Sequence, residues 1–156
     1  MKQLLKTLTE TFGPSGYEDA VRKVILKEVK SLADEVRVDA LGNLIARKKP
    51  SDSAKNPKKI MLAAHMDEIG VIVSHIDKKG FARFTNVGGT FGRYTLGARV
   101  RFLDGTPGVV GYDRLEQMDT AVPINKMYID VGASSKENCP VKVGDVAAFE
   151  RPFVEM

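Results

Sequence analysis

Apolar residues recur every three or four positions in the first third of the chain, which is the spacing of one face of a helix. The pattern predicts a short amphipathic helix over residues 2–12 and a second helix from about Tyr17 to Ala33. Between them, Ser15 stands three residues before Glu18, the spacing of a capping box that would start the second helix. The expected apolar faces are Leu4, Leu5, Leu8 and Phe12 in the first helix and Ala20, Val21, Val24, Ile25, Val29 and Leu32 in the second.

The apolar period then changes to two, which is typical of strands. Two strands are expected around residues 36–38 and 44–46, joined by a turn in which Gly42 is free to take a positive φ. Beyond an exposed loop over residues 49–57, the continuous apolar run from Ile60 to Ala64 predicts a strand buried on both faces. Two helices followed by strands of this kind predict a layered α/β domain.

From about Gly70 onward the sequence shows no convincing helix, only short apolar or alternating runs separated by glycines and turn pairs. Six such runs predict a small β-barrel or sandwich. We place the boundary near residues 68–71, so residues 1–69 are expected to form part of an α/β domain and residues 70–156 a β-rich domain. The six expected strands are Val71–Ile76, Phe81–Phe84, Arg99–Leu103, Gly108–Tyr112, Met127–Val131 and Asp145–Phe149.

Composition narrows the class of protein. The 156 residues are 43% hydrophobic and carry a formal net charge of +4, which is ordinary for a globular chain and argues against disorder. The densest basic stretches, Arg47–Lys49 and Lys58-Lys59, flank a polar loop, so a solvated loop rim is favoured over a nucleic-acid site. The single cysteine, Cys139, excludes an intrachain disulfide and fits a cytoplasmic setting. No apolar run is long enough for a signal peptide or a membrane span.

The main candidate for chemistry is His65-Met66-Asp67, which directly follows the apolar run. Ligands of open α/β sheets gather at the carboxyl ends of strands, and on extended backbone His65 and Asp67 point to the same side. A neutral imidazole is a good zinc ligand, and a nearby carboxylate can fix its tautomer. From spacing alone the alternative is a strand-end histidine that simply bonds its neighbours.

The remaining candidates favour structural roles. His75 lies within an expected strand, and Cys139 lies in an expected loop with no charged histidine or helix start beside it. The stretch Gly88–Gly92 lacks the lysine and the helix of a phosphate-binding loop and is interpreted as a β-turn.

Five segments in order resemble metallopeptidase family 42, which includes glutamyl and deblocking aminopeptidases and proteins labelled endoglucanase M. The resemblance covers nearly the whole chain, although residues 112–117 are unlike the usual sequence of the family. The segments are Phe12–Glu18, Asp39–Ile45, Ala64–Gly70, Tyr128–Ala133 and Val143–Asp145.

The resemblance implies the N-terminal part of a zinc-aminopeptidase-like α/β domain, followed by a small β-barrel-like assembly domain. It implies that His65 ligates one of two metals, zinc or cobalt, that Asp67 orients that histidine, and that Glu68 has no direct catalytic role. The implied substrate is the N-terminal residue of a peptide. The implied partner is a second copy of the chain, in dimers or tetrahedral dodecamers built through the β domain, and neither nucleic acid nor a membrane.

Other parts of the family pattern have no counterpart here. Such enzymes have a bridging aspartate, a Glu-Glu pair that holds the general base, a further carboxylate ligand and a late histidine, all downstream of the β domain. We therefore expect the 156-residue chain alone to bind metal weakly and to lack peptidase activity, because a catalytic zinc normally takes three protein ligands. The alternative is a non-catalytic oligomerisation module from a truncated reading frame. Glycan hydrolysis is disfavoured, since no pair of carboxylates is placed for it.

Overall fold

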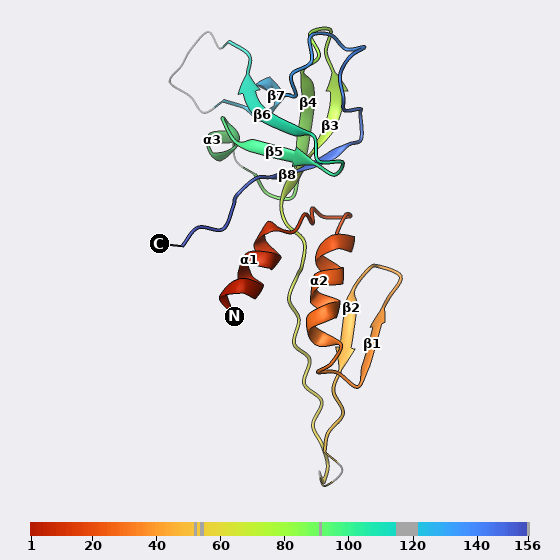
Figure 1. The fold of residues 1–156 in the computed structure, drawn as a ribbon. Helices are drawn as coiled ribbons and strands as arrows, with labels where there is room; N and C mark the ends of the chain where they lie inside the picture. The colour runs from red at the N-terminus through yellow and green to blue at the C-terminus, as the bar shows by residue number, and fades with distance from the viewer. Residues whose placement is uncertain (52, 54, 91, 115–121, 156) are drawn as a thin grey trace.

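The computed structural model describes residues 1–156 except 52, 54, 91, 115–121 and 156. Its N-terminal elements lie below a β-barrel, and one extended segment runs from the bottom of the molecule up into the barrel (Figure 1). The N-terminal elements are α1 (Lys2–Glu10), α2 (Asp19–Val29), β1 (Glu35–Val38) and β2 (Leu44–Arg47). The barrel elements are β3 (Gly70–Ile76), β4 (Ala82–Val87), α3 (Gly92–Thr95), β5 (Arg99–Phe102), β6 (Pro107–Tyr112), the 3-10 turn η1 (Ile124–Lys126), β7 (Met127–Asp130) and β8 (Val146–Phe149).

The two predicted helices are present, but the predicted capping box is wrong. Glu18 is the N-cap of α2 and has no side-chain capping bond; its carboxylate instead accepts from the N–H of Gly16 at 2.6 Å. The hydroxyl of Ser15 donates to Asp67, which is 52 positions further along the chain. The Ser15 side chain therefore makes a tertiary hydrogen bond, and not the helix cap that the local spacing predicted.

The predicted hairpin is confirmed in β1 and β2. The strands pair antiparallel from Glu35 opposite Arg47 to Val38 opposite Leu44, and Gly42 takes a φ of +87° in the connecting turn. The Asp39 carboxylate fixes this turn by accepting from the N–H groups of Leu41 and Asn43 at 3.0 and 2.9 Å, as Asx residues commonly do.

The predicted barrel is confirmed and contains the main core. All six strands are antiparallel to their neighbours and close in the order β3-β4-β7-β6-β5-β8. In β5 inward positions alternate with outward ones, so Val100 and Phe102 are buried and Arg99 and Arg101 are exposed, whereas all four residues of β8 are buried. One helical turn, α3, follows the glycines at 88 and 89, although no helix was expected beyond Gly70; Phe91 of that stretch lies outside the described residues.

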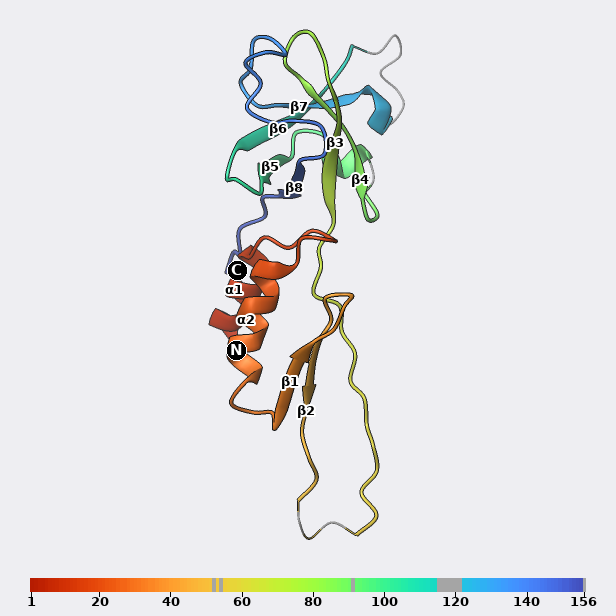
Figure 2. The same cartoon turned by 90° about the vertical axis from the view of Figure 1, so that its right-hand side faces the viewer.

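The prediction of a doubly buried strand from Ile60 to Ala64 is wrong. In this structure Ile60, Met61 and Leu62 are 85, 88 and 94% exposed, and the segment belongs to no strand. It runs as a single extended chain beside the hairpin (Figure 2), because β1 and β2 pair with each other and not with it. Apolar periodicity reports the environment that a segment requires, and no described residue provides that environment here.

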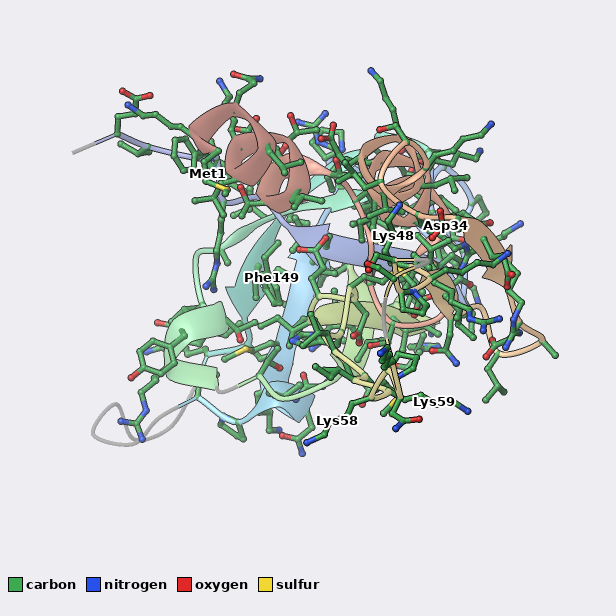
Figure 3. The ribbon with its side chains drawn as sticks, turned by 90° about the horizontal axis from the view of Figure 1, so that it is seen from below. Met1, Asp34, Lys48, Lys58, Lys59 and Phe149 are labelled. Carbon is green, nitrogen blue, oxygen red and sulfur yellow. The ribbon has the colours of Figure 1, made fainter. Side chains whose placement is uncertain are left out.

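Basic residues of the neighbouring loop rim lie at the surface. Lys48 reaches Asp34 at 3.2 Å, whereas Lys58 and Lys59 project outward and are exposed (Figure 3). Across the described part of the chain, none of the helices has the length and apolarity needed to cross a membrane.

The loop between α1 and α2, the extended segment and the barrel meet in close contact at one place, which we call the junction. Gly13 and Glu68 exchange two hydrogen bonds, from the Glu68 N–H to the Gly13 carbonyl at 2.9 Å and from the Gly13 N–H to the Glu68 carboxylate at 3.1 Å. Gly70 follows where a Cβ would lie 2.7 Å from the carbonyl oxygen of Ala147 in β8 and 3.2 Å from Pro14. Only a glycine fits at this point of contact.

Candidate metal centre

His65 and Asp67 lie at the end of the extended segment, just before the junction with the barrel. Extended backbone places side chains two residues apart on one side, and the His65 Nδ1 lies 2.9 Å from the Asp67 Oδ1. The His65 side chain is 85% exposed, whereas that of Asp67 is 35% exposed. The expected contact between the two residues is therefore present.

Asp67 has a second partner. The hydroxyl of Ser15 donates to Oδ2, the carboxylate oxygen that does not contact His65. The bond from Ser15, and then the bond from His65, hold the pKa of the Asp67 carboxyl below its usual value. Asp67 is therefore ionised at neutral pH and can only accept hydrogen bonds. Its hydrogen bond with His65 requires the proton on Nδ1, and in the neutral ring this tautomer leaves the lone pair on Nε2.

Glu68 behaves differently from its neighbour. Its carboxylate faces the loop between the helices, and burial raises its pKa although the Gly13 N–H donates to it. Glu68 therefore acts in the junction described above, whereas His65 bonds to Asp67.

Zinc or cobalt fits His65 as one ligand, because a histidine whose Nδ1 donates to a carboxylate is the usual form of a metal-binding imidazole. Across the described residues, no group of three or more His, Cys, Asp or Glu side chains is placed to hold a metal ion. The described residues therefore offer one imidazole with a supporting carboxylate at this place.

The other sequence candidates lie elsewhere. His75 is exposed on β3, opposite Arg83 of β4, and Cys139 is half-buried against the barrel core. Both positions agree with structural or surface locations.

Sequence reasoning missed two sets of contacts. The first is the contact of Ser15 with Asp67, since the sequence assigned Ser15 to a helix cap. The one sequence signal for another role was its place in the segment Phe12–Glu18. On the barrel, Arg83 donates to both Asp77 and Asp113, at 3.0 and 2.6 Å, and lies 5.3 Å from the centre of the Tyr128 ring. Asp113 belongs to the stretch 112–117 that the sequence analysis set apart; residues 115–117 lie outside the described residues.

Comparison with known families and proteins gives consistent matches. A family model described as M42 glutamyl aminopeptidase matches residues 42–156. A putative aminopeptidase of Acetivibrio thermocellus is 49% identical over 152 residues, which cover 96% of this chain and 44% of that protein.

Solved structures extend the similarity to the fold. An aminopeptidase from the archaeon Desulfurococcus kamchatkensis superposes with a TM-score of 0.89 at 39% identity, covering 99% of this chain and 44% of that one. A TET peptidase of Pyrococcus horikoshii, described as assembling into a tetrahedron or a large octahedral shell, gives a TM-score of 0.79 at 36% identity over 95% of this chain and 46% of that one. The chain thus spans somewhat less than half the length of these relatives.

Proposed function

Because the chain belongs to the M42 glutamyl aminopeptidase family, we propose that it supplies part of the metal centre of an aminopeptidase that removes N-terminal residues from peptides. His65 is the metal ligand and Asp67 orients it. The observation that carries this proposal is the hydrogen bond from Nδ1 of an otherwise exposed imidazole to the Asp67 carboxylate, which leaves Nε2 available.

The metals proposed are two ions of zinc or cobalt, which suit histidine and carboxylate ligands. A pair of such ions lowers the pKa of a shared water and polarises a peptide carbonyl when bound. Within the chain, His65 presents Nε2, Asp67 holds the proton on Nδ1, and the junction at Gly13 and Glu68 fixes the backbone that carries both. The remaining ligands come from outside the described residues.

The experiment measures aminopeptidase turnover on a panel of aminoacyl chromogenic substrates, with added zinc or cobalt. We expect no turnover from the 156-residue chain alone. We expect metal-dependent turnover when it is co-expressed with a polypeptide that corresponds to the remaining length of the Acetivibrio thermocellus relative. His65→Ala should abolish the restored turnover, and His75→Ala, the matched control on the barrel surface, should leave it unchanged.

Two outcomes would overturn this proposal. Restored turnover that survives His65→Ala would remove the assigned ligand. Metal-dependent turnover by the chain alone would mean that its own residues, or those of a second copy, complete the ligand set.

A second candidate function is assembly through the barrel, with residues 1–69 and 70–156 as separate units. The closed barrel contains most of the buried apolar side chains, and the Pyrococcus horikoshii relative is described as forming shells. Size-exclusion chromatography with light scattering tests it directly. An oligomer that persists without added metal supports assembly, and a monomer at all concentrations contradicts it. A cytoplasmic setting remains part of this proposal.

A further inference from the structure

We propose that Ser15 is a positioning residue of the metal centre, which fixes the Asp67 carboxylate and, through it, the tautomer and orientation of the His65 ring. The inference deepens the proposed function and rests on it. Its physical basis is the bond from the Ser15 hydroxyl to Oδ2 of Asp67, while Oδ1 contacts the imidazole.

The two bonds together constrain the carboxylate. An aspartate held at one oxygen alone can rotate about its terminal torsion, since that torsion is broad. Ser15 holds the second oxygen, so the plane of the carboxylate is set and the oxygen that faces Nδ1 is kept in place. Outer partners of this kind orient the ligating histidine in known metal sites.

The backbone under Ser15 is fixed against the same segment that carries Asp67. Pro14 and Glu68 form a parallel bridge, and Gly13 exchanges two hydrogen bonds with Glu68. Gly13 also packs on α2, where a Cβ would lie 2.9 Å from the Val21 side chain. The backbone that carries the Ser15 hydroxyl is therefore held against the backbone that carries Asp67.

A helix-capping role does not account for Ser15. Glu18 is the N-cap of α2 and has no side-chain capping bond, and Ser15 donates to Asp67 and not to the helix. The side chain is thus committed to the site.

The test compares Ser15→Ala and Ser15→Cys with Ser15→Thr, which keeps the hydroxyl. The matched control is Thr11→Ala, which deletes a hydroxyl at the end of α1 that donates to the Thr7 carbonyl and has no bond to Asp67 or His65 within the described part of the chain. The readout is the tautomer of His65 at alkaline pH, measured by long-range 1H–15N NMR on the metal-free 156-residue chain. Barrel methyl resonances report whether each variant is folded.

We expect the Nδ1–H form to dominate in the wild type. In Ser15→Ala the ratio of Nδ1–H to Nε2–H should fall about fivefold, because the freed carboxylate no longer holds its hydrogen bond to Nδ1, and one such bond is worth about that factor. In Ser15→Cys, whose thiol is a weaker donor, the tautomer ratio should lie between those of the wild type and Ser15→Ala. Ser15→Thr and Thr11→Ala should keep the wild-type ratio. In the complemented enzyme, Ser15→Ala should lower zinc affinity by roughly tenfold.

An unchanged tautomer ratio in folded Ser15→Ala or Ser15→Cys overturns the inference, as does an equal change in Thr11→Ala. The readout requires neither metal nor turnover, so it separates the two proposals. A ratio that responds to Ser15 in a protein that gains no metal-dependent turnover supports the positioning role and contradicts the proposed function.

Discussion

Glu68 carries a carboxylate that burial makes harder to ionise. Its pKa is raised in the folded chain, so its protonated form favours folding below the unfolded value, and that contribution is lost as pH rises through the folded value. Glu68→Gln keeps an oxygen for the Gly13 N–H and removes the charge. We expect the variant to be more stable than the wild type at pH 8 by up to about 1 kcal/mol, because a half-exposed group keeps part of its hydration.

Thermal unfolding of both proteins at pH 8 and at pH 4 measures this difference. The advantage of Glu68→Gln should disappear at pH 4, where the wild-type residue is also neutral. A pH-independent difference would mean that shape, and not charge, decides the stability. Glu28→Gln, at an exposed carboxylate on α2, provides the control.

Single residues also mark where the sequence was sufficient and where it was not. The pairing of His65 with Asp67 could be predicted, because two residues on an extended backbone share a side. The contact of Ser15 with Asp67 could not, because it joins positions 52 apart and competes with a local capping motif that looks complete. Local patterns carry no information on which distant acceptor a hydroxyl will meet.

At the scale of elements, β6 contains a glycine that the barrel requires. A Cβ on Gly108 would lie 2.4 Å from Ile129 in β7 and 3.3 Å from Val100 in β5, so the interior has no room for one more carbon. We expect Gly108→Ala to destabilise the chain by about 1–3 kcal/mol. Urea unfolding measures the loss, and Gly89→Ala, which meets no atom within 4 Å, should cost little. Equal effects at both positions would contradict the packing argument.

The elements of the barrel were predictable and those around the site less so. All six barrel strands were expected within a few residues, since each is a short apolar or alternating run that ends at a turn signal. The run from Ile60 to Ala64 was also correctly recognised as apolar, but its burial was inferred from a sheet that the described residues do not form. A strand buried on both faces depends on neighbours, and a single chain segment cannot specify them.

At the scale of the whole molecule, the exposed apolar segment determines how the isolated chain behaves. The three consecutive residues Ile60, Met61 and Leu62 are almost fully exposed. Exposed apolar runs of this kind favour self-association. We expect Leu62→Lys to lower light scattering severalfold at high protein concentration and to leave the melting temperature within about 2 °C of wild type, because the side chain packs on nothing here. Leu103→Lys, at an exposed leucine on the barrel, is the control. If Leu62→Lys left the light scattering unchanged and Leu103→Lys reduced it, the surface that self-associates would lie on the barrel.

Because there is no space at Gly70, the orientation of the barrel relative to the extended segment affects where His65 lies. The backbone runs from His65 through Gly70 into β3 over five residues, roughly 17 Å of extended chain. A rotation of the barrel by about 2° at that point displaces the histidine backbone by roughly 0.5 Å, which is the tolerance within which catalytic groups must be held. The orientation of the barrel therefore affects how precisely the proposed metal ligand is placed. Any contact that turns the barrel, however far from His65, changes where the imidazole points.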